Sequence, residues 1–303
     1  MSLTAEQTSI RSRGVGSSEI GAVAGVNPYQ SIHDVWLTKR GLATFTGNLA
    51  TRMGSMIEDA IIHEYSDMMR AEGEPHETAN FRTTFRHPDE PWILASPDRL
   101  VFGKRRLVEA KNVGFRSMFD WGTRPDELPD SYRCQVEWQM GVCDAVSRLG
   151  LTSEPEPLET HVVAWIGGCD MRVYRVSRDM RLWNALVSQA RIFWFDNVLA
   201  NVAPEIDGSE GAKRMVNTLF RESWKPFEKA TEAETELVLA LREAKAKTER
   251  AEEYEEELRS RIKSQLGHRE GLIGEGWKVT WKTQKDGKRP FKVQDITVKE
   301  SNR

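Results

Sequence analysis

Residues Ser96 to Lys111 read SPDRLVFGKRRLVEAK and contain the most informative pattern in the chain. Its apolar residues form two short β-like runs on either side of a turn at Gly103-Lys104. Alternate residues of a strand share a face, so Glu109 and Lys111 point the same way, and the turn can bring Asp98 back beside Glu109. The stretch therefore predicts two neighbouring strands that carry a pair of carboxylates and a lysine.

This combination of side chains suits phosphodiester hydrolysis. Two carboxylates repel each other in water-poor surroundings, and a hard divalent cation such as Mg²⁺, which takes oxygen ligands and keeps several waters, removes that repulsion. A lysine beside them can orient or help deprotonate the attacking water, or neutralise charge that develops on the phosphate.

The tripeptide Glu-Ala-Lys is weak evidence by itself, because Glu243-Ala244-Lys245 repeats it in a charged helical segment. An alternative interpretation stays open, in which Asp98 caps a turn and Glu109 pairs with Lys111 on a solvated strand. Glu58 is also ambiguous. It lies in a predicted helix of residues 51–72, where an exposed structural glutamate is the commoner outcome.

The pattern on both sides of this stretch predicts an α/β (α+β) core in residues 1–203. N-terminal helices come first, then a single meander built from the strand-like segments between residues 80 and 111, then a helix, a hairpin and a closing helix. Residues 204–225 are expected to be a linker. Residues 226–303 predict a charged helix followed by β-strands.

Composition excludes several classes of protein. The chain has 303 residues, of which 39% are hydrophobic and 29% charged, and no apolar run approaches the roughly 18 residues of a membrane span. Its three cysteines form no C-x-x-C pair, which argues against a zinc ribbon or a disulfide framework. The first residues lack a secretion signal, so a cytoplasmic location is expected. A formal charge of −3 means that any binding to nucleic acid must be local.

Five motifs in order carry a resemblance to a known family. They are RSRGVGSSEI from residue 11 with Asn27-Pro28-Tyr29, Gly54-x-x-x-Glu58, Ser96-Pro97-Asp98, Glu109-Ala110-Lys111, and the helix residues Tyr132-x-x-Gln135-Val136-x-Trp138-Gln139. Over about residues 10–200 the chain resembles the YqaJ-type viral recombinases, relatives of phage lambda exonuclease in the PD-(D/E)XK nuclease superfamily. The resemblance implies a restriction-endonuclease-like core, with a central mixed sheet flanked by helices.

The resemblance also implies roles for individual residues. Asp98, Glu109 and the backbone carbonyl of Ala110 would bind metal, Lys111 would act on the water, and Glu58 would orient a hydrated metal or that water. A pocket for the 5′-phosphate and DNA would be formed by Arg11, Arg13, Ser18, Ser96, Tyr132 and Gln135. Two departures stand out. Arg99 replaces a glycine that is common in the family, where it would reach a phosphate or face solvent, and Asp89 or Glu90 lies only near the position of an additional acidic residue.

The function implied is a Mg²⁺-dependent 5′→3′ exonuclease on double-stranded DNA, with Mn²⁺ able to replace Mg²⁺. Such an enzyme leaves 3′ single-strand overhangs for an annealing protein, and its relatives form trimeric rings. A phage or prophage origin in a bacterial cytoplasm, and no membrane, would follow. Two alternatives remain: a structure-specific or nicking endonuclease on the same fold, and a non-catalytic module that binds DNA ends or the annealing protein.

Overall fold

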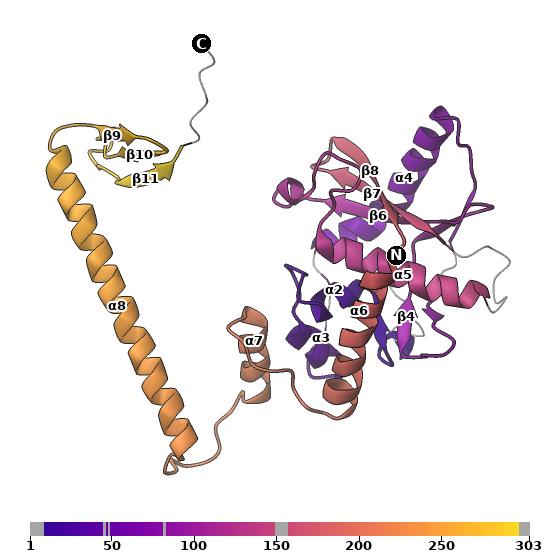
Figure 1. Cartoon of the computed structure of the whole chain (residues 1–303), viewed down its shortest axis with the longest axis horizontal. Helices are drawn as coiled ribbons and strands as arrows, with labels where there is room; N and C mark the ends of the chain where they lie inside the picture. Colours follow the sequence, from indigo (N-terminus) through magenta and orange to yellow (C-terminus); the bar gives the residue numbers. More distant parts are fainter. Residues whose placement is uncertain (1–8, 45–46, 48, 81–82, 149–156, 297–303) are drawn as a thin grey trace. The chain divides into compact units, whose positions relative to one another are not determined.

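The computed structural model describes residues 9–44, 47, 49–80, 83–148 and 157–296. The chain divides into two compact units, residues 1–223 and residues 224–303. The first unit contains a five-stranded sheet in the order β2-β5-β6-β7-β8. Figure 1 labels β6, β7 and β8 of this sheet. Its strands are β2 (Thr78–Ala79), β5 (Arg99–Val101), β6 (Arg106–Val113), β7 (Glu159–Ile166) and β8 (Asp170–Ser177).

The five-stranded sheet is mixed. Strands β6 and β7 pair in parallel along their whole length, from Arg106 opposite Glu159 to Val113 opposite Ile166. The other three pairings in this sheet are antiparallel. Helices pack on both of its faces, so the predicted α/β core with a central mixed sheet flanked by helices is confirmed.

A second sheet corrects the prediction of one meander. Strand β4 (Ile93–Ala95) pairs in parallel with β1 (Val15–Gly16) and antiparallel with β3 (Phe85–Arg86), and none of these three joins the five-stranded sheet. The chain leaves β4 at Ser96-Pro97 and enters β5 at Arg99. Because proline has no N–H to donate to a ladder, the two strands cannot continue as one, and the chain changes sheets there.

Two long helices cover opposite faces of the five-stranded sheet. Helix α4 (Leu49–Ala71) buries Ile61, Tyr65 and Met69 against Val108. Helix α5 (Asp130–Arg148) buries Val136 and Met140 in the cluster that contains Leu107, on the other face. Since side chains alternate along β6, Glu109 and Lys111 share the face of Leu107 and meet α5.

Five further elements of the first unit pack mainly around the smaller sheet and the far side of α5. They are α2 (Ser17–Val23), α3 (Ile32–Lys39), α6 (Met180–Ile192), the π-helical turn η2 (Phe193–Leu199) and α7 (Glu210–Leu219). The 3₁₀ turn η1 (Met118–Asp120) instead packs Met118 against the cluster that contains Leu107 on the five-stranded sheet. Trp138 on α5 lies at the centre of this core, fully buried, and its indole N–H donates to the Leu94 carbonyl at 3.0 Å.

Part of the segment expected to be a linker, residues 204–225, is a helix that docks on the core. Helix α7 places Met215 in the buried cluster that contains α3. The Arg214 guanidinium lies 2.7 Å from the Asp34 carboxylate, which also closes the N-terminus of α3. An amphipathic helix inside a polar, proline-containing segment explains why composition alone suggests a linker here.

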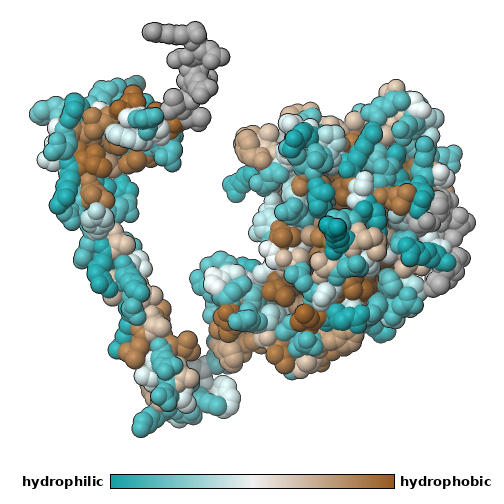
Figure 2. Space-filling model, viewed as in Figure 1, coloured by the Kyte–Doolittle hydropathy of each residue, from teal (hydrophilic) through white to brown (hydrophobic). Residues whose placement is uncertain are grey.

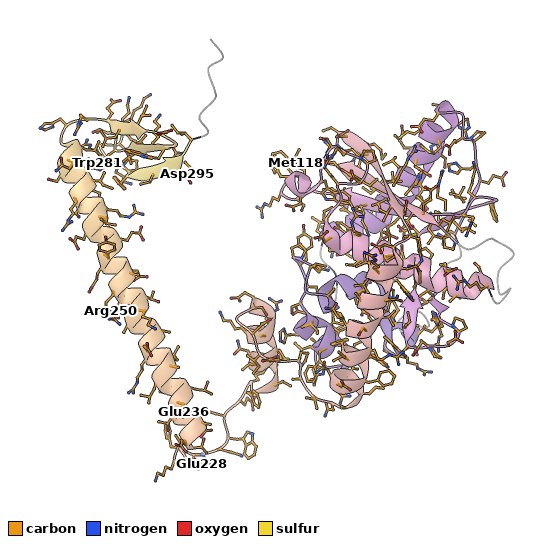
Figure 3. The ribbon with its side chains drawn as sticks, in the orientation of Figure 1. Met118, Glu228, Glu236, Arg250, Trp281 and Asp295 are labelled. Carbon is orange, nitrogen blue, oxygen red and sulfur yellow. The ribbon has the colours of Figure 1, made fainter. Side chains whose placement is uncertain are left out.

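The second unit consists of one long helix and a small sheet (Figures 1 and 3). Helix α8 spans 35 residues, Glu232–Leu266, and begins at a Thr231 cap. Strands β9 (Gly271–Gly274), β10 (Trp277–Thr280) and β11 (Lys292–Asp295) form an antiparallel sheet in the order β11-β10-β9. Across the part of the chain that the structure describes, no helix has both the length and the apolar character needed to cross a membrane.

The packing of α5 on α6 gives a test of the core. A Cβ atom at Gly141 on α5 would come within 2.3 Å of the Trp183 ring, so Gly141→Ala should overpack the core and lower the free energy of unfolding by about 1–3 kcal/mol. Gly54→Ala on α4 is the matched control, because no atom lies within 4 Å of its added Cβ, and alanine should gain up to about 1 kcal/mol. Denaturant unfolding of both variants measures this, and equal changes would contradict the packing described.

Candidate active site

The two carboxylates of the predicted pair lie side by side at the junction of β5 and β6. Asp98 immediately precedes β5, whose first residue, Arg99, pairs with Val108. One carboxylate oxygen of Asp98 accepts the backbone N–H of Ala110 at 2.9 Å, which holds Asp98 next to the Glu109–Ala110 peptide. The hairpin therefore brings together the acidic residues that ten intervening residues separate in the sequence.

Glu109 is fixed by three side chains that donate to its two carboxylate oxygens. The Lys111 ammonium and the Gln135 amide each lie 2.6 Å from Oε1, and the Gln139 amide lies 2.8 Å from Oε2. Only 3% of Glu109 is exposed. The interpretation of Glu109 and Lys111 as a solvated surface pair does not fit this burial, because the carboxylate is enclosed between the sheet and α5.

Gln135 and Gln139 are four residues apart and so lie on one face of α5. The family resemblance assigned Gln135 to the phosphate pocket and gave Gln139 no role. The structure places Gln135 between Glu109 and Lys111, with its amide oxygen 3.2 Å from the lysine, and its role toward a phosphate stays a prediction. The spacing of two amides by one helical turn was the signal in the sequence that both would face the same strand.

The carboxylates repel one another at this site. Burial raises the pKa of Asp98 well above its usual value, and the nearby charges of Glu109 and then Glu58 raise it further, against the opposing charge of Lys111 and the Ala110 N–H. Burial lowers the pKa of Lys111, but the negative charges of Glu109 and Asp98 outweigh burial, so the pKa is raised overall. Lys111 is therefore a charged ammonium at neutral pH, suited to stabilising negative charge rather than to removing a proton.

Glu58 reaches this junction from α4 but is paired with Arg99. The Arg99 guanidinium lies 3.0 Å from the Glu58 carboxylate and also contacts the Asp59 carboxylate. It donates to the Asp98 backbone carbonyl at 2.6 Å as well, and the residue is 6% exposed. Arg99 thus neither faces solvent nor extends toward a ligand, because three acceptors hold it under α4.

The predicted phosphate-binding residues begin at the N-terminal loop. Arg11 donates to the Ser18 hydroxyl at 2.7 Å, so Ser18 holds the arginine. The Arg11 carbonyl accepts from the buried Lys39 ammonium at 2.7 Å, which also pairs with Glu19 at 2.7 Å. Arg13 is exposed. Lys39 therefore anchors this loop to the core, and Arg11 is the arginine that contacts Ser18.

Strand pairing places Ser18 and Ser96 at one edge. Gly16 on β1 pairs in parallel with Leu94 on β4. Ser18 follows Gly16 by two residues, and Ser96 follows Leu94 by two residues, so both serines lie at the same end of this strand pair. The Ser96 hydroxyl lies 3.0 Å from that of Thr84. Because Trp138 of α5 bonds to the Leu94 carbonyl, Gln135 lies one helical turn from this edge.

Tyr132 lies on the same helix one turn before Gln135. The Lys111 ammonium lies 5.0 Å from the centre of its ring, within the range of a cation–π contact. Tyr132 therefore belongs with the lysine and the carboxylates. No hydrogen bond between residues in the described ranges joins Arg11 to Ser96 or Gln135, so the structure shows these residues as neighbours on adjoining elements, not as a closed pocket.

A divalent cation fits the acidic part of the site. Asp98 and Glu109 supply hard oxygen ligands next to the Ala110 peptide. Burial and then the repulsion from Glu109 raise the pKa of Asp98, and a bound cation would offset both. Within the described residues no group of three His, Cys, Asp or Glu side chains forms a ready-made cage. The donor set therefore suits an ion that keeps several waters. Glu90 does not extend it, because this residue accepts from Trp92 at 2.6 Å and contacts Arg191.

Comparison with known proteins supports the resemblance. The model of the YqaJ-like viral recombinase domain matches residues 7–146, a range that contains every candidate site residue named above. Protein YqaJ of Bacillus subtilis (strain 168) is 27% identical over 288 residues, covering 90% of this chain and 81% of its own. The predicted resemblance to the YqaJ-like recombinases is confirmed.

Among solved structures, an alkaline exonuclease from Laribacter hongkongensis matches with a TM-score of 0.49 and 18% identity, over 71% of this chain and 100% of its own. A phage-related exonuclease from Haemophilus somnus matches with a TM-score of 0.44 and 12% identity, over 62% of this chain and 96% of its own.

The repulsion around Asp98 predicts that this residue destabilises the fold. Its pKa is raised in the folded protein, so the folded state binds the proton more tightly than the unfolded state. Without added divalent cation, stability should therefore rise as the pH falls toward that pKa. Asp98→Asn keeps an oxygen for the Ala110 N–H and removes the charge. We expect it to raise the free energy of unfolding at pH 7.5 by about 0.5–2 kcal/mol.

Urea unfolding in a chelating buffer, at pH 7.5 and at pH 5.5, measures both effects. Asp67→Asn on the exposed side of α4 is the control, since its carboxylate lies in a surface pair with Arg70. A destabilised Asp98→Asn variant would contradict the electrostatic account.

Proposed function

We propose that this chain is a divalent-cation-dependent deoxyribonuclease that digests one strand of a DNA duplex from its 5′ end. The observation that carries the proposal is the buried cluster of Asp98, Glu109 and Lys111, held by α5 within a YqaJ-like recombinase domain. The cluster joins carboxylates that repel each other to a charged lysine, which is the combination expected where a metal and a phosphate meet.

Each residue has a distinct task in this proposal. Asp98, Glu109 and the Ala110 carbonyl would hold Mg²⁺, or Mn²⁺ in its place, and the bound ion would polarise the phosphate and lower the pKa of a bound water. The Lys111 ammonium stabilises the negative charge that develops on the phosphate. Gln135 and Gln139 keep Glu109 in one orientation, so its ligand geometry is set in advance.

Glu58 would orient the attacking water from α4. In the structure its carboxylate is held by Arg99, which keeps two other acceptors, Asp59 and the Asp98 carbonyl, if Glu58 turns toward the site. Arg99 therefore offsets part of the negative charge around Asp98 while leaving Glu58 close to the reacting atoms.

The end specificity rests on the residues at the β1 and β4 edge. A guanidinium binds phosphate with two parallel hydrogen bonds, and hydroxyl donors complete such a site. Arg11 with Ser18, and Ser96 directly after β4, supply these groups one helical turn from Gln135. We therefore propose that they bind the 5′-phosphate, that digestion runs 5′→3′, and that the 3′ overhang passes to a single-strand annealing protein. Assembly into a trimer and a cytoplasmic location stay predictions.

Digestion of a linear duplex labelled on one strand tests the chemistry. Wild type should release nucleotides from the 5′ end in Mg²⁺. Glu109→Gln and Lys111→Met should each lower this rate by at least about a hundredfold. The first variant removes the charge of a metal ligand, and the second removes the charge that stabilises the phosphate. Lys245→Met, in the second copy of the Glu-Ala-Lys tripeptide on α8, is the control. If the wild type binds ends without cutting them, a binding module replaces the nuclease. Cuts inside a covalently closed duplex would favour an endonuclease.

The phosphate site is tested by comparing duplex ends with and without a 5′-phosphate. Arg11→Ala should lose most of the preference for the phosphorylated end, lowering kcat/KM there by about ten- to a hundredfold while changing the rate on the 5′-hydroxyl end little. Arg13→Ala distinguishes the two arginines of the loop. A larger loss of preference in Arg13→Ala than in Arg11→Ala would reverse their assignment.

A further inference from the structure

The second unit carries opposite charges along its sequence. Between residues 224 and 257, eleven acidic residues stand against six basic ones, whereas between residues 259 and 292 ten basic residues stand against three acidic ones. The whole chain has a net charge of −3. The basic part, which includes the end of α8 and most of the small sheet, is therefore a local concentration of positive charge.

Strand register places lysines on one face of this sheet. Lys278 on β10 lies between Ile273 on β9 and Gln294 on β11, and Thr280 pairs with Lys292. Directly opposite residues share a face, so Lys278 and Lys292 lie on the face opposite Val279, which is only 3% exposed. Lys282 follows Thr280 by two residues. We call Lys278, Lys282 and Lys292 the lysine face.

Part of this positive charge has no acidic partner among the residues that the structure describes. Near the end of α8, acidic side chains pair along the helix, Glu255 with Arg259 and Glu257 with Arg261, each at 2.5 Å. On the sheet, Lys282 pairs with Glu270 at 3.0 Å. Of the acidic residues within the described ranges, none forms an ion pair with Lys278 or Lys292. These charges are therefore available to an external anion.

An exposed apolar side chain lies beside the lysines. Ile273, directly opposite Lys278 and therefore on the lysine face, is 72% exposed. Trp277, 41% exposed at the start of β10, lies on the other face with Val279. Figure 2 shows brown apolar side chains bordered by teal polar ones on this part of the molecule, and Figure 3 marks the sheet by Trp281 and Asp295. An exposed apolar side chain beside lysines suits unpaired bases, whose flat faces are free to pack against it while the backbone contacts the charges. The bases of a duplex hide those faces.

We propose that the β9–β11 sheet binds single-stranded nucleic acid, with the lysine face contacting the phosphates and the exposed Ile273 on the same face contacting the bases. This site is separate from the carboxylate cluster and does not depend on the proposed nuclease function. For a protein that produced a single-stranded overhang, it would retain the strand that is not digested.

The test measures binding of the full-length chain to a fluorescent 30-nucleotide oligothymidylate that has a 5′-hydroxyl end. A chelating buffer removes divalent cations, and the hydroxyl end offers nothing to a 5′-phosphate pocket. The test variant combines Lys278→Gln, Lys282→Gln and Lys292→Gln. The matched control combines Lys245→Gln, Lys247→Gln and Arg250→Gln, which removes the same charge from the exposed surface of α8.

We expect the lysine-face variant to bind at least about tenfold more weakly at 50 mM salt, and its slope of log affinity against log salt to fall by about two. The control should bind like the wild type. Unchanged thermal unfolding of both variants excludes misfolding. Equal losses in the two variants would mean that only net charge matters and would overturn the proposal, as would wild-type binding by the lysine-face variant.

Two further measurements distinguish single-strand binding from duplex binding and from self-association. A blunt 30-base-pair duplex should bind more weakly than the single strand, and the lysine-face variant should lose less affinity for it; the reverse order would overturn the choice of single strands. Sedimentation shows whether the lysine face instead contacts the acidic part of α8 in a second copy. In that case the lysine-face variant would differ from the wild type in the mass of its assembly in solution and not in its affinity for DNA. Release of 5′ nucleotides from duplex ends is measured separately, so failure of the nuclease proposal leaves this test intact.

Discussion

Two hydrogen bonds, from the side-chain amides of Gln135 and Gln139 on α5 to the Glu109 carboxylate, set the geometry of the site. A buried carboxylate is costly unless donors surround it, and Gln135, Gln139 and Lys111 supply those donors from two elements. The same contacts fix where α5 crosses the sheet, because an apolar cluster around Val136 and Met140 lies beside them. Packing and chemistry are therefore joined along one helix, and neither can shift without the other.

The change of sheets at Ser96-Pro97 is the second determinant of the architecture. It separates β4, which Ser96 follows directly, from β5, which Asp98 directly precedes. One short connection therefore links the two groups of candidate residues. Two buried cations hold these groups in place. Arg99 pairs with Glu58 and Asp59 of α4, and Lys39 donates to the Arg11 carbonyl in the N-terminal loop.

The sequence predicted the structure well where strand alternation and turn residues were clear. Alternation predicted that Glu109 and Lys111 share a face, and the turn at Gly103-Lys104 predicted their approach to Asp98. The patterns failed where a tertiary partner decides. No pattern near Arg99 predicts its pairing with Glu58 and Asp59, which lie some forty positions earlier in the chain. The polar composition around Pro204 likewise gives no sign that α7 docks on the core. Two β-like runs separated by proline look like one meander until the parallel partner β1, far earlier in the chain, is known.

The geometry of α5 also bears on how such a chain can change over time. Gln135 faces the carboxylate on β6, and Trp138, three positions later, bonds to the carbonyl of Leu94 on the other sheet. One residue inserted between them would turn everything beyond it by about 100° and carry one of these contacts away from its strand. Loops around the core can lengthen at small cost, since closing a longer loop adds little entropy. Divergence of this chain should therefore gather in its connections, while the length of this one helical turn stays fixed.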